Sequence, residues 1–209
     1  PSTDAPETVK NEDDFNSQLS ALDSDLHTFI GKYPGAIGNS LQVQMCPASD
    51  SATNSAFDNW AYKDNFDAAP GNSSFATKKT ATDDEVHVAV IDKNGQFTGT
   101  NGTVLETYPF MSVAKNARNE DGTSNYVKDV INERSEYVWM VDFDSDFRQA
   151  GAGTNMADSG SNFNITTAAT GATKPASQIK TFNFASGADV SSLTLSLIHI
   201  SEPTRHSRI

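Results

Sequence analysis

The stretch Glu85–Asp92, EVHVAVID, decides the fold that this sequence predicts. Its valines fall at alternate positions and would share one face of a β-strand. The residues between them, His87, Ala89 and Ile91, would share the other face. Because both faces are largely apolar, the stretch predicts a central strand that is covered on both sides.

The residues that follow predict a hairpin. Asn94-Gly95 would supply the positive φ angles of a tight turn, and residues 97–102 would form a short return broken by glycines. Residues 104–111 would form the next strand. Pro109 cannot donate a ladder hydrogen bond, so this strand is expected at the edge of the sheet.

A helix and a further strand are expected after this hairpin. Thr123 or Ser124 would be the N-cap, and Arg134 would lie near the C-terminal end, where the helix dipole favours a cation. One face of the helix would be apolar, formed by Tyr126, Val127, Val130 and Ile131. The stretch 137–141, YVWMV, is apolar on both faces and predicts a second central strand.

The residues before Glu85 predict a helix, a strand and a long loop. An amphipathic helix is indicated by apolar residues at helical spacing, with Asp13 or Asp14 near its N-terminus: Phe15, Leu19, Leu22 and Leu26. Residues 41–45 alternate apolar and Gln residues, which indicates a strand with one buried face. Residues 47–80 are rich in Ser, Asn, Asp and Ala, and we expect a partly ordered surface excursion there.

Together these elements predict an α+β fold, with a mixed or antiparallel sheet, flanking helices and long surface loops. The expected organisation has five parts. They are a polar N-terminal segment with its helix (1–31), an α+β domain (32–148) carrying the 47–80 excursion, a Gly/Ala/Ser/Thr-rich linker (149–178), the start of a next module (179–194) and a tail (195–209).

Composition limits the function classes. The formal net charge is -12 and the pI about 4.6, so the surface would repel phosphate backbones and nucleic-acid binding is not expected. Cys46 is the only cysteine, which rules out an internal disulfide. Mean hydropathy is -0.49, and no apolar run approaches the roughly 20 residues that would span a bilayer, so no membrane partner is expected.

Candidate reactive residues lack the partners that chemistry would need. Cys46 has no base nearby in the sequence, and His87 is expected to be a packed strand residue. The remaining histidines, His27, His199 and His206, have no metal-ligand spacing. We therefore predict no catalytic residue, no cofactor-binding residue and no metal ligand, and hence no enzyme activity.

The run Asp142–Asp146, DFDSD, looks like the start of a calcium loop. Such a loop needs glycine at its sixth position and a bidentate glutamate at its twelfth. Here those positions hold Phe147 and Gly153. A solvated acidic turn after a buried strand is the expectation.

An ordered series of motifs begins with KYPGAIGNSLQVQM and the valine-rich strand, continues through D-x-x-G-x-F-T-G-T and G-T-V-L-E, and ends with E-D-G-T-S-N-Y-x-K-D-V-I-N. This series resembles the tail sheath family of contractile-tailed bacteriophages, in its T-even and marine cyanophage form. It covers residues 32–142. Residues 181–189, TFNFASGAD, resemble the G-G-x-D turn that begins the next sheath module, with Ser186 in place of a glycine.

The resemblance implies a structural virion protein. Sheath subunits stack as rings around a tail tube and contract to drive the tube through the host envelope. Expected partners are copies of the chain itself, the tail tube protein, and baseplate and tail terminator proteins. The expected location is the phage tail, assembled in the host cytoplasm, and the resemblance implies no cofactor and no catalytic residue.

The last residues differ from the rest of the sequence. LSLIHISEPTR, at 195–205, resembles the translation of a sequencing-library adapter, so we expect residues from about Leu195 onward not to belong to the natural protein. The chain would then be an internal fragment, and we expect the fragment alone not to polymerise.

Two other function classes stay open from the residues themselves. A carbohydrate-binding or adhesin domain would use the aromatic residues at 57–66, Trp60 among them, as a ligand platform. A calcium-dependent enzyme fragment would use Asp144 in the acidic run.

Overall fold

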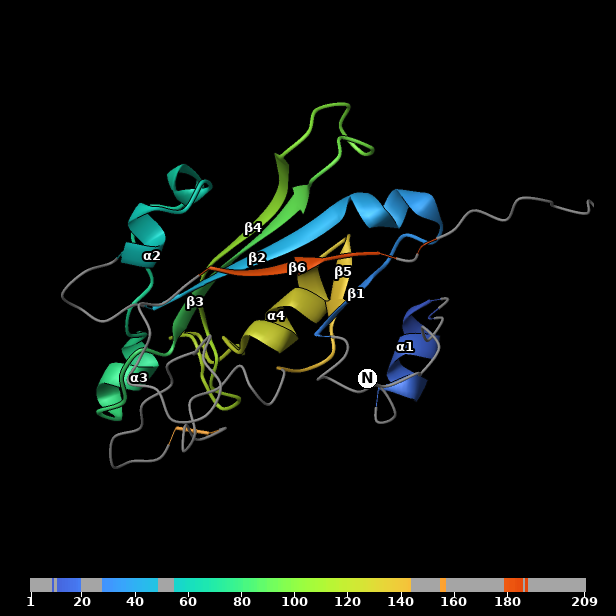
Figure 1. The fold of residues 1–209 in the computed structure, drawn as a ribbon. Coiled ribbons are helices and arrows are strands. Elements are labelled where there is room, and N and C mark those ends of the chain that lie inside the picture. The colour runs from blue at the N-terminus through green and yellow to red at the C-terminus, as the bar shows by residue number, and fades with distance from the viewer. Residues whose placement is uncertain are drawn as a thin grey trace, which may run out of the picture.

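The computed structural model describes residues 9, 11–19, 28–48, 55–143, 155–156, 179–185 and 187 (Figure 1). In this part of the chain the helices are α1 (Glu12–Gln18), α2 (Ser55–Asp58), α3 (Ser74–Lys78) and α4 (Val127–Arg134), with 3-10 turns η1 (Ala36–Ser40) and η2 (Lys63–Asn65). The strands are β1 (Phe29–Gly31), β2 (Leu41–Pro47), β3 (Glu85–Asp92), β4 (Thr103–Ser112), β5 (Val138–Met140) and β6 (Lys180–Asn183).

The main sheet has the strand order β4-β3-β2-β6, and each neighbouring pair is antiparallel (Figure 1). The predicted α+β fold is thereby confirmed. β3 is a central strand and β4 lies at an edge, as the alternation in EVHVAVID and the proline in the next strand predict. β6 forms the other edge and pairs with β2, although more than half of the chain separates the two strands in sequence.

The two faces of β3 contribute to two different cores. Its valines belong to the larger core, which also includes alternate residues of β2 and the buried face of α4. That helical face consists of Tyr126, Val127, Val130 and Ile131, as predicted. On the opposite face, Ala89 and Ile91 pack in a smaller cluster with Cys46, Trp60 and Phe66.

Residues 56–66 cover this second face through Ala56, Trp60 and Phe66, whereas Ala76 of α3 packs in the larger core. Trp60 is 3% exposed and Phe66 9% exposed, whereas the sequence predicted a surface excursion here. The Trp60 indole N–H donates to Gln44 of β2 at 2.7 Å, which anchors the covering segment to the sheet. Large aromatic rings supply enough apolar area to bury even a segment of polar composition.

The strand in YVWMV does not lie in the main sheet, which corrects the prediction of a second central strand. β5 pairs only with β1, in a separate two-stranded sheet. Its residues are nonetheless buried on both faces, because Val138 and Met140 face the larger core while Trp139 faces α1. The Phe15 ring of α1 stacks on Trp139 with centroids 5.1 Å apart.

The helix ends differ in detail from the predictions. α1 has Asn11 as its N-cap, with Asp13 and Asp14 in the first turn as expected. The predicted Leu22 and Leu26 of this helix lie outside the described residues. α4 begins after Tyr126 without a side-chain cap, so the predicted Thr123 or Ser124 cap is wrong.

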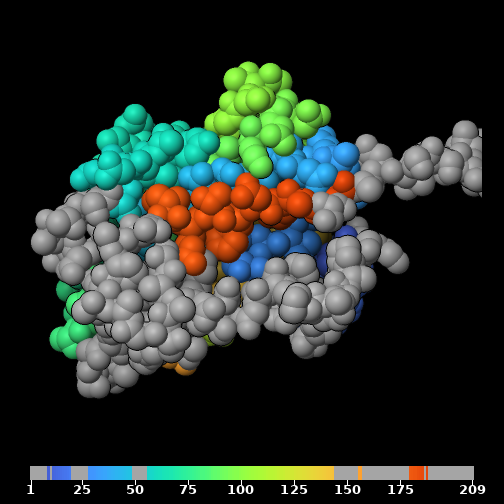
Figure 2. All heavy atoms as spheres, in the orientation of Figure 1, coloured from blue at the N-terminus to red at the C-terminus, as the bar shows by residue number. Residues whose placement is uncertain are grey.

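The connection between β3 and β4 is longer than the predicted Asn-Gly turn. Of this pair only Gly95 has positive φ, at 72°, and pairing resumes at Thr103. The loop 93–102, called the knob below, projects beyond the sheet at the top of Figure 2. No described helix is long and apolar enough to cross a membrane.

Candidate functional site

Cys46 lies inside β2, and the strand register places His87 of β3 directly opposite it. The sequence indicated no base near this cysteine, because a sequence does not show which residue lies opposite another on a neighbouring strand. The thiol is nevertheless unsuited to nucleophilic chemistry. It is fully buried, and burial raises its pKa to about 12, which keeps it protonated.

Both ring nitrogens of His87 are already engaged. Its Nδ1 accepts a hydrogen bond from the Phe110 backbone N–H at 3.0 Å, so Nε2 carries the proton and donates to the Ala68 carbonyl at 2.7 Å. Burial lowers the pKa of His87, and its hydrogen bonds to Ala68 and Val86 only partly offset this. The imidazole is therefore a neutral structural bridge rather than a base for Cys46.

His87 also contacts a residue of β4, Phe110, that has an unusual backbone conformation. Phe110 has φ 51°, a left-handed conformation that is uncommon outside glycine. It lies at the register shift between β3 and β4, and its ring meets the His87 ring edge-on with centroids 4.6 Å apart. On the other side, Phe66 stacks on the same imidazole at 4.5 Å. The predicted packed role of this histidine is confirmed.

A buried carboxylate that the sequence did not single out lies near α3. Asp84 is fully buried and accepts hydrogen bonds from the Ser73 N–H and hydroxyl, both at 2.8 Å, and from the Ser112 hydroxyl at 2.6 Å. Ser73 is the N-cap of α3, and Ser112 ends β4. This cluster joins a helix start to a strand end, and its acceptors are satisfied.

The acidic run after β5 begins with an ion pair. The Asp142 carboxylate lies 3.3 Å from Lys115 Nζ and also accepts from the Phe143 N–H at 2.7 Å. Burial alone would raise the pKa of Asp142, but the hydrogen bond from Phe143 and the charge of Lys115 hold it below its usual value. Asp144 and Asp146 lie outside the described residues. Among the residues that are described, no group of three or more His, Cys, Asp or Glu side chains could hold a metal ion.

The aromatic residues at 57–66 do not form the ligand platform that a carbohydrate-binding role would require. Trp60 and Phe66 are buried, and their rings stack on each other with centroids 5.0 Å apart. Their faces are occupied by the protein itself. No described contact therefore favours the adhesin alternative.

The knob is held by one carboxylate at its base. Asp92 is fully buried and accepts hydrogen bonds from donors on both sides of the loop. The donors are the Ser40 hydroxyl at 2.6 Å, the N–H groups of Gln96, Phe97 and Thr98 at 3.0, 3.0 and 2.8 Å, and the Thr98 hydroxyl at 2.9 Å. Burial would raise the pKa of Asp92, but the hydrogen bonds from Ser40 and the knob outweigh it and lower the pKa.

An exposed apolar turn, residues 33–37, lies beside the knob. Tyr33 and Ile37 are each 38% exposed and are the exposed large apolar residues among those the structure describes. The Tyr33 ring meets Phe97 of the knob edge-on at 5.0 Å and stacks near Tyr137 at 5.6 Å. The turn is thus preformed and braced by aromatic contacts from two other segments.

Tyr137, which stacks near Tyr33, has its pKa raised first by burial and then by nearby acidic groups, Glu106, Glu136 and Asp92 among them. The knob and the apolar turn form the candidate interaction surface of this domain.

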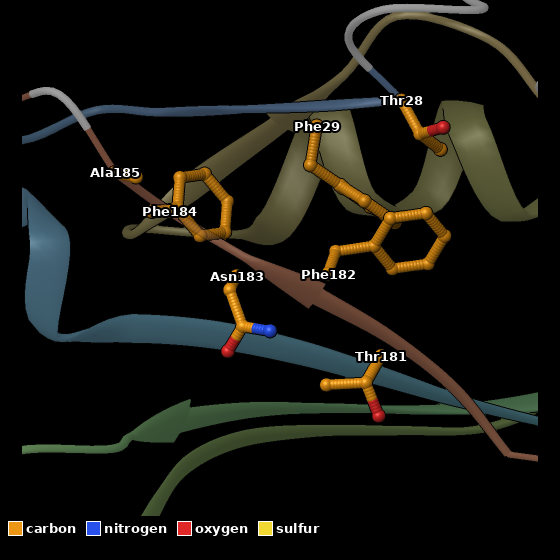
Figure 3. A pocket seen from close by; sticks show the side chains of 7 residues that line it. All are labelled: Thr28, Phe29, Thr181, Phe182, Asn183, Phe184 and Ala185. Carbon is orange, nitrogen blue, oxygen red and sulfur yellow. The ribbon is translucent and has the colours of Figure 1, made fainter.

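A recess lies between β1 and β6 (Figure 3). Its volume is about 460 Å³, and its apolar lining consists of Phe29, Phe182 and Phe184. Phe29 and Phe182 already meet edge-to-face with centroids 5.0 Å apart. Next to this recess, the Asn39 side chain holds Gly187 by two hydrogen bonds, of 2.7 Å to its carbonyl and 2.8 Å from its N–H.

Comparison with known proteins gives one informative similarity. No family model matches the chain. Over 97 residues the chain is 35% identical to the tail sheath protein of Salmonella phage ViI. The match takes in 46% of this chain but only 12% of that relative. The chain is thus similar to part of a tail sheath protein and spans a small fraction of its length.

This similarity agrees with the resemblance that the motif series indicates. It supports a relationship to tail sheath proteins. The likeness to sheaths of the T-even and cyanophage type stays a prediction, as does the absence of catalytic and metal-binding residues.

Proposed function

We propose that this chain is part of a contractile tail sheath subunit of a bacteriophage. The subunit would assemble with copies of itself in stacked rings around a tail tube and contract to drive that tube through the host envelope. The observation that carries the proposal is the 35% identity over 97 residues to a phage tail sheath protein. The ordered motif series between residues 32 and 142 agrees with it.

The physical basis of such a function is a change of contacts between subunits. A ring stack grows through head-to-tail contacts that do not close on themselves. Contraction converts one set of packed contacts into another, and the free-energy difference between the two sets performs the work. Neither step needs a cofactor or a bond-breaking reaction. Baseplate, terminator and tube proteins are the other expected partners, in a tail assembled in the host cytoplasm.

The described domain has features that fit an outward or subunit-facing position in such an assembly. The knob is anchored by a buried carboxylate, and the apolar turn is braced by rings from two other segments. Contact surfaces that are rigid before binding lose little conformational entropy when a partner docks.

The proposal is tested by expressing both this chain and the complete reading frame that encodes it. Negative-stain electron microscopy of the complete product should show tubes of stacked rings. The 209-residue chain should sediment as a monomer, because it spans only a small part of the related sheath protein. Dispersed particles from the complete product under all assembly conditions, or a turnover activity that one polar substitution abolishes, would contradict the proposal.

A further inference from the structure

The knob contains two Asn-Gly dipeptides in different environments. Asn94-Gly95 lies at its start and Asn101-Gly102 at its end. Both asparagines are exposed, so sequence and exposure alone do not distinguish them. Their difference lies in the backbone N–H of the glycine that follows each asparagine.

The Gly102 N–H is engaged, whereas the Gly95 N–H is not. Gly102 donates to the Asp92 carbonyl oxygen at 2.8 Å, which closes the base of the knob. Within the described residues, neither the Gly95 N–H nor the Asn94 side-chain amide has a hydrogen-bond partner. The backbone N–H of Asn94 itself donates to the Ser40 hydroxyl at 3.1 Å, so this residue is held in place while its side chain is free.

We propose that Asn94 is a site of spontaneous deamidation in the folded protein and that Asn101 is protected. The Gly95 backbone nitrogen loses its proton and attacks the Asn94 side-chain carbonyl carbon, forming a five-membered succinimide. The bond from that carbon to the amide nitrogen breaks, and ammonia leaves with the proton. Water then opens the ring at either carbonyl and leaves aspartate or isoaspartate, with no oxidant or reductant involved.

Glycine at position 95 makes this attack accessible. It has no Cβ to hinder the approach of its nitrogen, and its φ of 72° is strained for other residues. At position 102 the nitrogen would first have to break its hydrogen bond to Asp92, which opens the end of the knob. The same dipeptide therefore reacts at one end of the loop and is protected at the other.

The product would change the knob in two ways. It adds a negative charge two residues from the Asp92 carboxylate, on a chain whose formal net charge is already -12. Isoaspartate also lengthens the backbone by one carbon between the N–H that reaches Ser40 and the Gln96 N–H that reaches Asp92. The two hydrogen bonds cannot both keep their geometry, so the knob should be less ordered after deamidation.

The test is to incubate the purified chain at mildly alkaline pH and to follow both sites by fragment-ion mass spectrometry. Fragment ions are needed because tryptic cleavage after Lys93 leaves both asparagines in one peptide. In the folded chain Asn94 should convert at least roughly fivefold faster than Asn101, the factor that one net backbone hydrogen bond represents. In urea the two rates should become similar, because the protection of Asn101 is lost.

The variant Asn94→Gln is the matched control and should remove the fast phase and its isoaspartate, detected by enzymatic methylation. Equal rates at the two sites in the folded chain would overturn the proposal. So would faster conversion at Asn101, or an Asn94 that converts in urea but not in the folded chain.

Discussion

Replacement of Asp92 by alanine should loosen the knob and lower the stability of the whole domain. The carboxylate is fully buried at the end of β3 and accepts from Ser40 on one side and from the knob on the other. Without it, the Ser40 hydroxyl and the N–H groups of Phe97 and Thr98 lose their acceptor, and the Gln96 N–H keeps only a 3.3 Å hydrogen bond to the Ser40 hydroxyl oxygen. The knob would then be tied to the sheet by the Gly102 hydrogen bond to the Asp92 carbonyl and by the hydrogen bonds of the Lys93 and Asn94 N–H groups to Ser40.

The size of the effect follows from these hydrogen bonds. A hydrogen bond to a charged group contributes about 1.5–3 kcal/mol, but donors in an exposed loop reach water once the carboxylate is gone. The loss should therefore be well below the sum and close to about 3 kcal/mol in the free energy of unfolding, the cost of breaking a buried charged network. Asp92→Asn keeps one acceptor oxygen and should cost about half as much.

Urea unfolding followed by tryptophan fluorescence measures this loss, with an unchanged m-value expected. Asp67→Ala is the matched control, because Asp67 is exposed and no measurable change is expected there. The lowered pKa of Asp92 adds a pH signature: its contribution is present above the unfolded pKa near 3.8 and is lost as pH falls through the lower folded value. A loss below about 1 kcal/mol for Asp92→Ala would refute the anchoring role.

Three further substitutions test other contacts. Because burial lowers the pKa of His87, the stabilising effect of this histidine should be present above the unfolded pKa of 6.5 and be lost as the pH falls below it. The urea midpoint of the unsubstituted chain should therefore drop on acidification, whereas that of His87→Gln should not. The buried Trp139 indole N–H has no partner among the described residues, so Trp139→Phe should change the free energy of unfolding by less than about 1 kcal/mol, measured in urea. A Cβ on Gly187 would overlap the Gly35 carbonyl, so Gly187→Ala should break the Asn39 hydrogen bonds and speed amide exchange in β6, whereas unchanged exchange would exclude that clash.

The strands of the main sheet could be predicted because their burial has a local signature. β3 is buried at every position from Val86 to Ile91 and is apolar there except at His87, and β2 alternates, so the sequence of each strand indicates which of its faces are covered. β5 shows the limit of that reasoning. YVWMV is apolar on both faces, but one of its faces is covered by α1 through Phe15, and no local pattern says which element provides the cover.

The contacts that position the candidate surface could not be predicted, because their partners are far apart in sequence. Asp92 and Ser40 are separated by 52 residues, and Asp84 and Ser112 by 28. A lone aspartate at the end of a strand looks like a solvated turn residue in the sequence. The cross-strand position of His87 opposite Cys46 was missed for the same reason, since pairing between strands is a property of register.

Two sets of long-range hydrogen bonds meet at the end of η1. Ser40 donates to Asp92 and accepts from Asn94, and its carbonyl accepts from Lys93 at 2.7 Å, so it reaches the knob from three directions. The preceding residue, Asn39, holds Gly187 beyond β6. The knob and Gly187 are therefore held by two adjacent residues, Ser40 and Asn39, although they lie far apart in the sequence.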